Sequence, residues 1–299
     1  MRGRVWAQTF AAHAPEFKFR IWPDVGDPAA VECLIAWAPA PSLISSLPNL
    51  KILFSSGAGV DQIDLSSVPP EVSVVRLVEP GIVNGMVEYA TMATLALHRD
   101  LLDYIRQQTA NAWRPIAVQP ASARKVGVMG LGVLGRAVLE RLGLFGFARY
   151  GWSRSPQHIA GVTTYAGADS LEQFLSHCDI LLCLLPLTTA TRGILDRNLF
   201  ASLPRGAALI NVGRGGHLDQ QALLDALSSG QLRSAILDVH DPEPLPDSHP
   251  FWQHPRILLT PHIASMTQPE TAALAVIDNL RGHERGEPLR DLIDRRQGY

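Results

Sequence analysis

One stretch of the chain, VGVMGLGVLGRAVLERLGLFG, constrains the fold more than any other. Gly130, Gly132 and Gly135 stand there in G-x-G-x-x-G spacing, after an apolar run and at the start of an amphipathic helix. In this context Gly130 permits a tight turn, Gly132 lets a pyrophosphate approach the backbone, and Gly135 allows the helix to pack closely on the strand. The anion then lies at the helix N-terminus. The stretch therefore predicts a dinucleotide-binding βαβ unit; the alternative is a glycine-rich turn without a ligand.

Strand-like runs alternate with amphipathic helices along the rest of this region. The alternation predicts an α/β fold with a doubly wound parallel sheet, because its Val, Ile and Leu content is typical of strands buried on both faces. Asp219 is expected to cap the helix that Gly230 stops, and Ser170 with Gln173 is expected to form a capping box. The expected strands are RKVGVMG, ARYGWS, VTTY, DILLCLL, AALINV, SAILDV and RILLT.

The first part of the chain repeats this pattern on a smaller scale. A helix from about Met86 to Thr109, and another that starts within the T-x-x-E box from Thr267 to Glu270, are expected to cross between the two parts. Because single cores stop growing at about 250 residues, 299 residues predict two Rossmann-like lobes. The lobes are a smaller flavodoxin-like substrate domain, residues 1–97 plus 270–299, and a dinucleotide-binding domain, residues 98–269. The expected strands of the smaller lobe are FKFRIW, VECLIAWA, KILFSS and VSVVRLV.

The segment RYGWSRSPQ, residues 149–157, lacks the acid that dinucleotide-binding folds normally carry. About 20 residues after the first glycine, that acid accepts a hydrogen bond from the ribose 2′-hydroxyl. Trp152, Ser153, Arg154 and Ser155 stand there instead. A guanidinium pairs with a 2′-phosphate, which a carboxylate would repel, and serine hydroxyls donate to its oxygens. We therefore expect NADP (NADPH) as cofactor, with weaker use of NAD; alternatively, Arg154 stacks on the adenine or faces solvent.

Three ionisable residues directly follow expected strands: Arg214, Glu243 and His262. Ligands of open α/β sheets bind outside the carboxyl ends of the strands, so one edge should hold all three. Histidine holds and releases a proton near neutral pH, a nearby carboxylate favours its protonated form, and arginine offers a planar charged fork. These residue types suit hydride reduction of a 2-keto acid. His262 would then donate the proton, Glu243 would orient His262, and Arg214 would bind and polarise the substrate.

Each of these residues also has a structural explanation when it is taken alone. A lone histidine is often structural, an arginine between glycines can bind a carbonyl, and Glu243 can belong to a solvated loop. His240, which lies between acids, competes with His262 as proton donor. Asp238 is expected to bond the nicotinamide carboxamide, with a role in a helix cap or a turn as the alternative.

The smaller lobe carries a second candidate binding segment, SSGAGVDQID, after the expected strand KILFSS. Gly57 and Gly59 expose backbone N–H groups that can form an anion nest for the substrate carboxylate; a plain strand-to-helix turn is the alternative. No metal site is expected, because His249, His254 and His262 lack the close ligand pairs typical of zinc.

Charge and composition exclude several kinds of partner. With 26 basic and 28 acidic side chains and no basic stripe, the chain offers little attraction for nucleic acid or anionic lipid. No apolar run approaches the roughly 20 residues of a membrane span, and the first residues lack a signal-peptide pattern. Cys33, Cys178 and Cys183 lie in or beside apolar stretches, so reduced, buried thiols are expected. We expect a cytoplasmic protein with a small-molecule partner.

Several motifs follow one another in a characteristic order: GLGVLG, WSRS, LLPLTTATRGIL, LINVGRGG, LDVHDPEPLP, WQHPRILLTPH and the final QGY. In this order the chain resembles the D-isomer-specific 2-hydroxyacid dehydrogenases, in particular their NADPH-dependent glyoxylate/hydroxypyruvate reductase A subgroup. The resemblance runs from SSGAGVDQID to Tyr299 and is thinner over about the first 40 residues. It assigns the catalytic roles to Arg214, Glu243 and His262, and implies a homodimer formed through the cofactor domain. It also implies that the substrate carboxylate contacts Gly57, Ala58, Gly59 and Val60.

The implied activity is reduction of glyoxylate to glycolate, or of hydroxypyruvate to D-glycerate, by hydride transfer from NADPH to C2. The alternatives are a reductase for bulkier 2-keto acids and a non-catalytic NAD(P)-sensing regulator of the same fold. In some relatives a bulky residue of the partner subunit reaches the active site, and Trp37 is the candidate here. The complete cofactor-binding set expected is Gly130, Gly132, Val133, Leu134, Gly135, Trp152, Ser153, Arg154, Ser155, Pro186, Val212 and Asp238.

Overall fold

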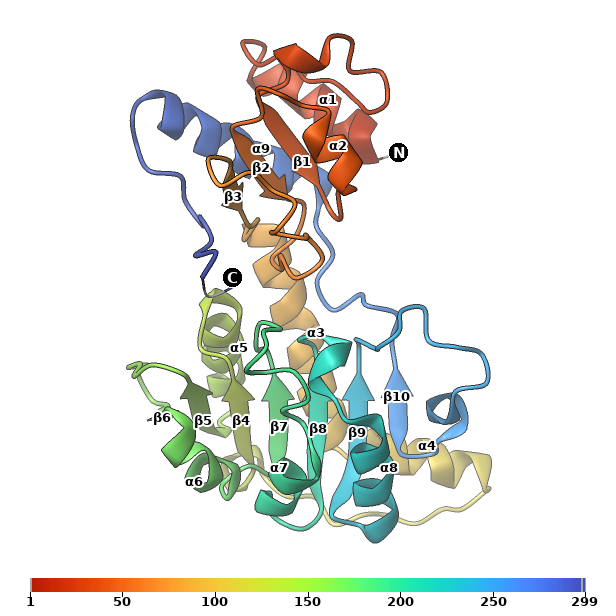
Figure 1. Ribbon diagram of the computed structural model, residues 1–299. Helices are drawn as coiled ribbons and strands as arrows, with labels where there is room; N and C mark the ends of the chain where they lie inside the picture. Colours follow the sequence, from red (N-terminus) through yellow and green to blue (C-terminus); the bar gives the residue numbers. More distant parts are fainter. Residues whose placement is uncertain (1, 297, 299) are drawn as a thin grey trace. The chain divides into compact units, whose positions relative to one another are not determined.

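A seven-stranded parallel sheet carries the glycine loop (Figure 1). The computed structural model describes residues 2–296 and 298 of the chain, so Gln297 and Tyr299 of the final QGY motif lie outside the described residues. The strand order is β10-β9-β8-β7-β4-β5-β6, and each of the seven runs expected for this region forms a strand. Their bounds are β4 Lys125–Met129, β5 Ala148–Ser153, β6 Thr163–Ala166, β7 Ile180–Cys183, β8 Ala207–Asn211, β9 Leu232–Leu237 and β10 Ile257–Leu259.

The glycine loop follows β4, the strand at which the order of strand addition reverses from one side of the sheet to the other. From β4 the chain moves outward to β5 and β6, and then crosses back to β7, which pairs with the other side of β4. Ligands of doubly wound sheets bind at this switch point, outside the carboxyl ends of the strands. The predicted doubly wound parallel sheet is thus confirmed.

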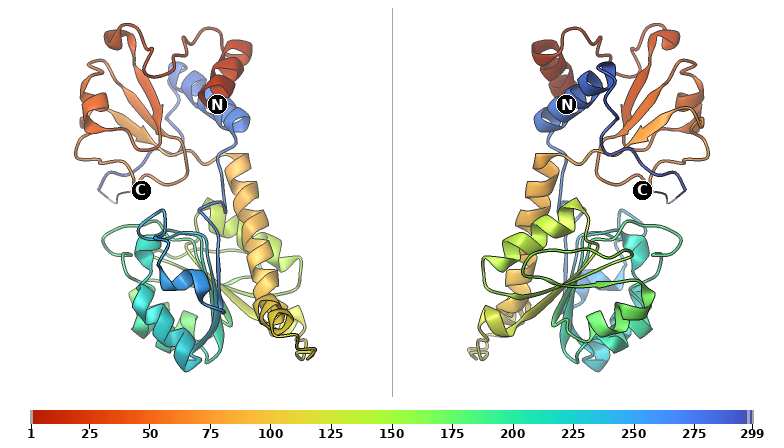
Figure 2. Two further views of the ribbon diagram at one scale, coloured as in Figure 1. Left: turned by 90° about the vertical axis from the view of Figure 1, so that its right-hand side faces the viewer. Right: turned by 90° about the vertical axis from the view of Figure 1, so that its left-hand side faces the viewer.

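Helices cover both faces of this sheet, as the side views in Figure 2 show. On one face α3 and α5 bury Ala93, Val138 and Leu142 against the strands, and on the other α6 and α8 bury Phe174 and Leu223. Strands enclosed in this way need apolar side chains on both faces, which explains their nearly continuous apolar sequences. The helices of this region are α3 Pro80–His98, α4 Leu101–Thr109, α5 Val133–Gly143, α6 Leu171–Leu175, α7 Arg197–Ser202 and α8 Gln220–Ser229.

A second sheet has three parallel strands in the order β1-β2-β3. Its strands are β1 Cys33–Ala36, β2 Ile52–Ser55 and β3 Ser73–Val75, and its helices are α1 Arg2–His13, α2 Pro41–Ser45 and α9 Pro269–Glu284. The expected strand FKFRIW is wrong, because this segment instead packs Phe17 and Phe19 against Phe10 of α1. The short 3-10 helices of the described residues are η1 Pro28–Ala30, η2 Ala121–Ala123, η3 Ala168–Ser170, η4 Gly215–His217 and η5 Pro250–Gln253.

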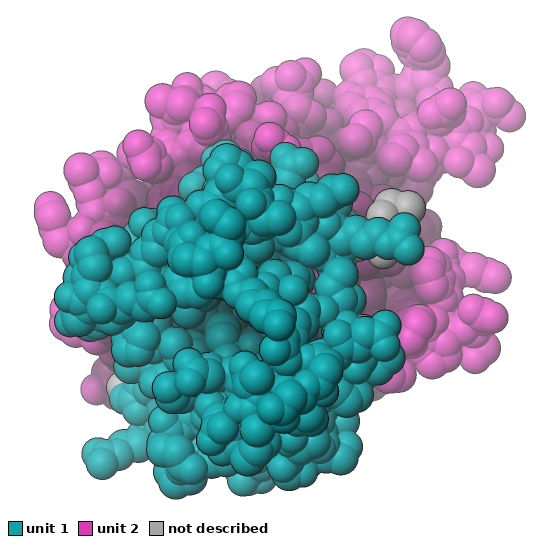
Figure 3. Space-filling model, turned by 90° about the horizontal axis from the view of Figure 1, so that it is seen from above, with its two compact units in different colours: residues 1–84, 266–299 teal, residues 85–265 magenta. Residues whose placement is uncertain are grey.

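The chain divides into two units, coloured separately in Figure 3. One comprises Met1–Asn84 and Met266–Tyr299, and the other comprises Gly85–Ser265. Both divisions lie earlier than the boundaries expected after residues 97 and 269. The first lies earlier because most of α3 packs on the larger sheet, and the second because Thr267 already donates a hydrogen bond to the Ser56 carbonyl of the smaller unit.

Local signals for helix ends were partly right. The Asp219 carboxylate caps α8 by accepting from the Ala222 N–H, and Gly230 ends α8 with a φ of 72°, both as expected. The Ser170 box does not form, because the Ser170 hydroxyl donates to the carbonyls of Ala166 and Gly167 instead. The Thr267 box is likewise wrong, because its hydroxyl is engaged with Ser56.

The expected helix from about Met86 to Thr109 is two helices in the structure. Helix α3 ends at His98 and α4 starts at Leu101. Asp100, between them, has a φ of 54°, in the left-handed region that interrupts a right-handed helix. Its carboxylate accepts a hydrogen bond from Arg233 at 2.8 Å, so an ion pair fixes the break.

Candidate active site

The loop after β10 brings His262 to Glu243. His262 Nδ1 lies 2.8 Å from Glu243 Oε2, and the two side chains are 31 % and 36 % exposed. Because the carboxylate engages Nδ1, donation of a proton by His262 would proceed through Nε2. The structure therefore joins two of the three residues that the sequence placed at the strand ends.

The second oxygen of Glu243 fixes its own loop. Glu243 Oε1 accepts a hydrogen bond from the His240 N–H at 2.8 Å. His240 Nε2 in turn lies 3.3 Å from the carbonyl oxygen of Thr260, at the start of the loop that carries His262. His240, the competing proton donor, thus contacts backbone on the same two loops as the pair of Glu243 and His262.

Asp238 is part of the turn that holds His262. Its side chain is 1 % exposed, and its carboxylate accepts from the Thr260 hydroxyl at 2.6 Å and from the N–H groups of Ile263 and Ala264 at 2.9 and 2.8 Å. The His262 N–H donates to the Asp238 carbonyl at 2.8 Å. The structure therefore shows the turn role that was the alternative to contact with the nicotinamide.

Arg214 lies in a tightly bonded turn after β8. The Arg214 N–H donates to His217 Nδ1 at 3.0 Å, and the Asn211 side chain donates to the Arg214 carbonyl at 3.1 Å. Asn211 and His217 are fully buried, and His217 Nε2 lies 3.2 Å from the Pro186 carbonyl. These two residues fix the Arg214 backbone. They escaped sequence reasoning because the spacing of the motif does not show that His217 turns inward.

The Arg214 turn packs directly against the loop of Glu243. A Cβ atom built on Gly215 would lie 1.9 Å from the backbone carbon of His240, so only glycine allows this approach. The backbone beside Arg214 therefore touches the backbone three residues before Glu243. The three predicted catalytic residues come from adjacent strand ends, as expected.

The glycine loop has the geometry that a pyrophosphate requires. Gly130 has a φ of 104°, and a Cβ on Gly135 would lie 1.9 Å from the Gly130 carbonyl oxygen. A Cβ on Gly132 would meet nothing within 4 Å, so its backbone faces open space at the start of the 11-residue helix α5. The first N–H groups of a helix have no intrahelical partner and attract anions. The loop therefore fits a dinucleotide, with Val133 and Leu134 in the first turn.

The segment after β5 is partly exposed at the expected place. Ser153 ends the strand, its hydroxyl donates to the Ser155 carbonyl at 2.8 Å, and Arg154 and Ser155 are exposed. Trp152 is not part of this surface: it is 8 % exposed, packs in the core and donates its indole N–H to the Gly167 carbonyl. Sequence reasoning missed Arg136 of α5, which hydrogen-bonds the Gln157 side chain and so fixes the end of this segment.

The other expected cofactor contacts line the same edge of the sheet. Val212 is buried directly after β8, where its N–H donates to the Cys183 carbonyl. The Pro186 carbonyl, after β7, accepts from the Thr191 hydroxyl at 2.7 Å. Pro186 is half-buried, whereas Val212 is 4 % exposed and packs in the apolar core, so its side chain faces the interior rather than a ligand.

In the smaller unit, the segment after β2 forms a closed turn. The Ser55 hydroxyl donates to the Gly59 carbonyl at 2.7 Å, and the Gln62 side chain donates to the same carbonyl at 3.1 Å. A Cβ on Gly57 would lie 2.6 Å from the Trp37 ring. Trp37 therefore packs beside the expected carboxylate-binding segment of its own chain.

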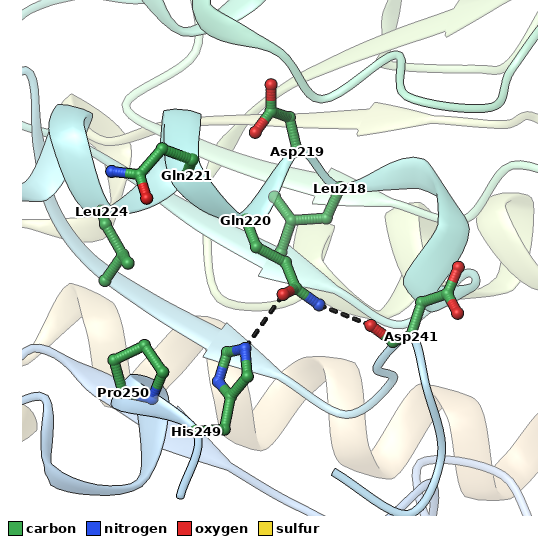
Figure 4. Close-up of a pocket in the computed structure, with 8 residues that line it drawn as sticks. All are labelled: Leu218, Asp219, Gln220, Gln221, Leu224, Asp241, His249 and Pro250. Carbon is green, nitrogen blue, oxygen red and sulfur yellow. Dashed lines mark hydrogen bonds between the residues drawn. The ribbon is translucent and has the colours of Figure 1, made fainter. Parts of the chain in front are cut away.

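One surface pocket lies away from the predicted catalytic residues. It has a volume of about 450 Å³ and lies between the start of α8 and the segment from Asp241 to Pro250 (Figure 4). Gln220 spans it, because its amide donates to the Asp241 carbonyl and its oxygen lies 2.9 Å from His249 Nε2. Neither Arg214, Glu243 nor His262 lines this pocket.

Within residues 2–296 and 298, no cluster of three His, Cys, Asp or Glu side chains has the arrangement to hold a metal ion. Across the same described residues, every helix is too short or too polar to cross a membrane.

Comparison with known proteins identifies the family. Residues 91–264 match the sequence profile of the NAD-binding domain of D-isomer specific 2-hydroxyacid dehydrogenases. The chain belongs to this family. A relative from Yersinia enterocolitica, named glyoxylate/hydroxypyruvate reductase A, is 38 % identical over 98 % of this chain and 96 % of its own length.

Two solved structures of the family are similar over nearly the whole chain. A D-isomer specific 2-hydroxyacid dehydrogenase from Xanthobacter autotrophicus Py2, in complex with NADPH and MES, has a TM-score of 0.94 at 38 % identity, covering 99 % of this chain and 96 % of its own. An NADPH-dependent glyoxylate/hydroxypyruvate reductase from Sinorhizobium meliloti, in complex with NADP and sulfate, has a TM-score of 0.91 at 35 % identity, covering 99 % and 96 %. Family membership and the two-lobed Rossmann-type fold are thus confirmed.

Proposed function

We propose that the chain is an NADPH-dependent reductase of small 2-keto acids, which reduces glyoxylate to glycolate and hydroxypyruvate to D-glycerate. The observation that carries this proposal is the 2.8 Å pair of His262 and Glu243, on the edge of the sheet that also carries the glycine loop. The relatives named as glyoxylate/hydroxypyruvate reductases support the substrate class.

The proposed chemistry divides between the cofactor and the side chains. NADPH bound at the glycine loop supplies the hydride that adds to C2 of the keto acid. The Arg214 guanidinium binds the substrate carboxylate and polarises its carbonyl, because it is planar and permanently charged. His262 Nε2 then donates a proton to the carbonyl oxygen as negative charge develops there. Glu243 holds the imidazole through Nδ1. We also propose that Gly57, Ala58, Gly59 and Val60 contact the carboxylate of the substrate.

The substrate class is tested by measuring NADPH and NADH oxidation with a panel of 2-keto acids. We expect the highest kcat/KM with glyoxylate and hydroxypyruvate, and a higher kcat/KM with NADPH than with NADH. Faster turnover of phenylpyruvate or 2-ketoisocaproate would favour a reductase for bulkier acids. NADPH binding without oxidation by any keto acid would instead favour the sensor.

Cofactor preference is proposed to come from Ser153, the last residue of β5, and from Arg154 and Ser155, which follow it. Replacing Arg154 with alanine should raise the KM for NADPH roughly 10- to 100-fold and leave the KM for NADH within about twofold, because a charged hydrogen bond contributes roughly 1.5 to 3 kcal/mol and only NADPH carries the 2′-phosphate. Steady-state kinetics with both cofactors measure this effect.

A suitable control for this variant is Arg197→Ala, because Arg197 is an exposed arginine paired with Asp225 on the surface. It should change neither KM. An Arg154→Ala enzyme that weakens both cofactors equally would show that Arg154 contacts the adenine rather than the phosphate.

We further propose a cytoplasmic homodimer that binds neither nucleic acid nor membrane. The near-neutral charge of the chain supports the last point. Cys178 and Cys183 are buried and free, and burial raises the pKa of Cys183 to about 12, which suits a reducing compartment. Exposed apolar side chains on α4 and on the residues after it support a dimer formed through the cofactor domain, because exposed apolar patches mark interaction surfaces. These side chains are Leu101, Ile105, Trp113 and Val118, and Trp113 is 99 % exposed.

A further inference from the structure

We infer that Tyr89 is a positioning residue for His262 and acts through Thr260 and Asp238. Tyr89 lies on α3, is 8 % exposed, and places its hydroxyl 2.5 Å from Thr260 Oγ1. Thr260 Oγ1 lies 2.6 Å from Asp238 Oδ1. A chain of two short hydrogen bonds therefore links a buried helix to the turn of the proposed proton donor. The inference rests on the proposed function, because it concerns the same histidine.

The direction of these hydrogen bonds follows from their partners. A carboxylate only accepts, so the Thr260 hydroxyl donates to Asp238 and is left to accept from Tyr89. Burial raises the pKa of Tyr89 to about 12, so the phenol remains protonated and can donate throughout the neutral range. Tyr89 therefore fixes the rotamer in which Thr260 donates to Asp238.

Asp238 connects the Thr260 hydroxyl to the backbone of His262 through hydrogen bonds. Its carbonyl accepts from the His262 N–H, and its carboxylate accepts from the next two N–H groups along the loop. His262 has a φ of 54°, a conformation that residues other than glycine adopt only when their surroundings hold them there. The direction of its imidazole thus depends on bonds that Asp238 makes and that Thr260 and Tyr89 align.

The variant Tyr89→Phe isolates the first link, because it removes one hydroxyl and leaves the ring packed. We expect kcat to fall about tenfold, the factor that loss of one hydrogen bond of about 1.4 kcal/mol gives. The KM values for NADPH and the keto acid should stay within about twofold, since the glycine loop and Arg214 are unchanged. A general loss of folding would instead lower the fraction of active enzyme and the midpoint of thermal unfolding.

The second link is tested at Thr260. Thr260→Val removes the hydroxyl and should lower kcat at least as far as Tyr89→Phe, whereas Thr260→Ser keeps the hydroxyl and should restore most of it. In the double variant Tyr89→Phe/Thr260→Val, kcat should equal that of Thr260→Val alone, because Tyr89 acts only through Thr260. Tyr104→Phe is the matched control: Tyr104 lies on α4, its hydroxyl accepts from the Ile116 N–H, and its replacement should leave kcat unchanged.

These measurements separate the inference from the proposed function. An active wild type that loses turnover with His262→Gln, but keeps full kcat with Tyr89→Phe, would overturn the role of Tyr89 and leave the proposed function standing. Equal losses in Thr260→Ser and Thr260→Val would also overturn it, and this pair decides the question if Tyr89→Phe does not fold. If the wild type did not oxidise NADPH with any of the keto acids, both the inference and the proposed function would be overturned.

Discussion

The variant His262→Gln should turn over roughly 10²- to 10⁴-fold more slowly than the wild type, the range that general acid catalysis contributes. Glutamine fills a similar space and its amide N–H can still reach Glu243, but it cannot release a proton at neutral pH. Binding of NADPH should be unchanged, because the glycine loop is a different segment of the chain. Stopped-flow or steady-state measurement of NADPH oxidation, with cofactor affinity from fluorescence titration, gives both quantities.

The control for this experiment is His240→Gln. His240 contacts the Thr260 carbonyl through Nε2 and donates its N–H to Glu243, so its ring has a structural partner. Its replacement should affect kcat much less than that of His262. A larger loss with His240→Gln, together with near-normal turnover of His262→Gln, would transfer the role of proton donor to His240.

How far the sequence predicts the site depends on how each residue is positioned. Arg214, Glu243 and His262 follow strands, and parallel strands deliver their carboxyl ends to one edge whatever the packing details are. The motif therefore determines where they meet. His217 and Tyr89 act through contacts that no local pattern shows: Tyr89 and Thr260 are 171 residues apart in sequence. Such residues are found only when the helices are packed on the sheet.

The fold shows the same division between local and long-range effects. Strands such as β4 and β8 are buried on both faces, so hydrophobicity alone identifies them. FKFRIW has a similar composition, but its aromatic side chains are used to cover Phe10 rather than to pair with a neighbouring strand. Hydroxyl groups are equally ambiguous, since Ser170 and Thr267 both prefer a nearby carbonyl to the capping role that their motifs suggest.

The role of Arg214 can be separated from its charge. Arg214→Lys should lower kcat/KM for glyoxylate by about 10²- to 10³-fold, the range seen when one donor to a developing oxyanion is removed. Lysine keeps the positive charge but has no planar fork, so it cannot bind the carboxylate and polarise the carbonyl together. The turn itself should survive, because Asn211 and His217 hold the backbone of residue 214 rather than its side chain.

Oxamate, which has the carboxylate and carbonyl of a 2-keto acid but accepts no hydride, reports binding apart from chemistry. Its inhibition constant against Arg214→Lys should rise together with the loss in kcat/KM, while Arg197→Lys, at an exposed ion pair, should change neither quantity. If oxamate bound normally and only kcat fell, Arg214 would act on the developing oxyanion alone, and the carboxylate would be held by the segment from Gly57 to Val60. If both quantities stayed normal, a positive charge at residue 214 would be sufficient, and the planar shape of the Arg214 guanidinium would have no part in the reaction.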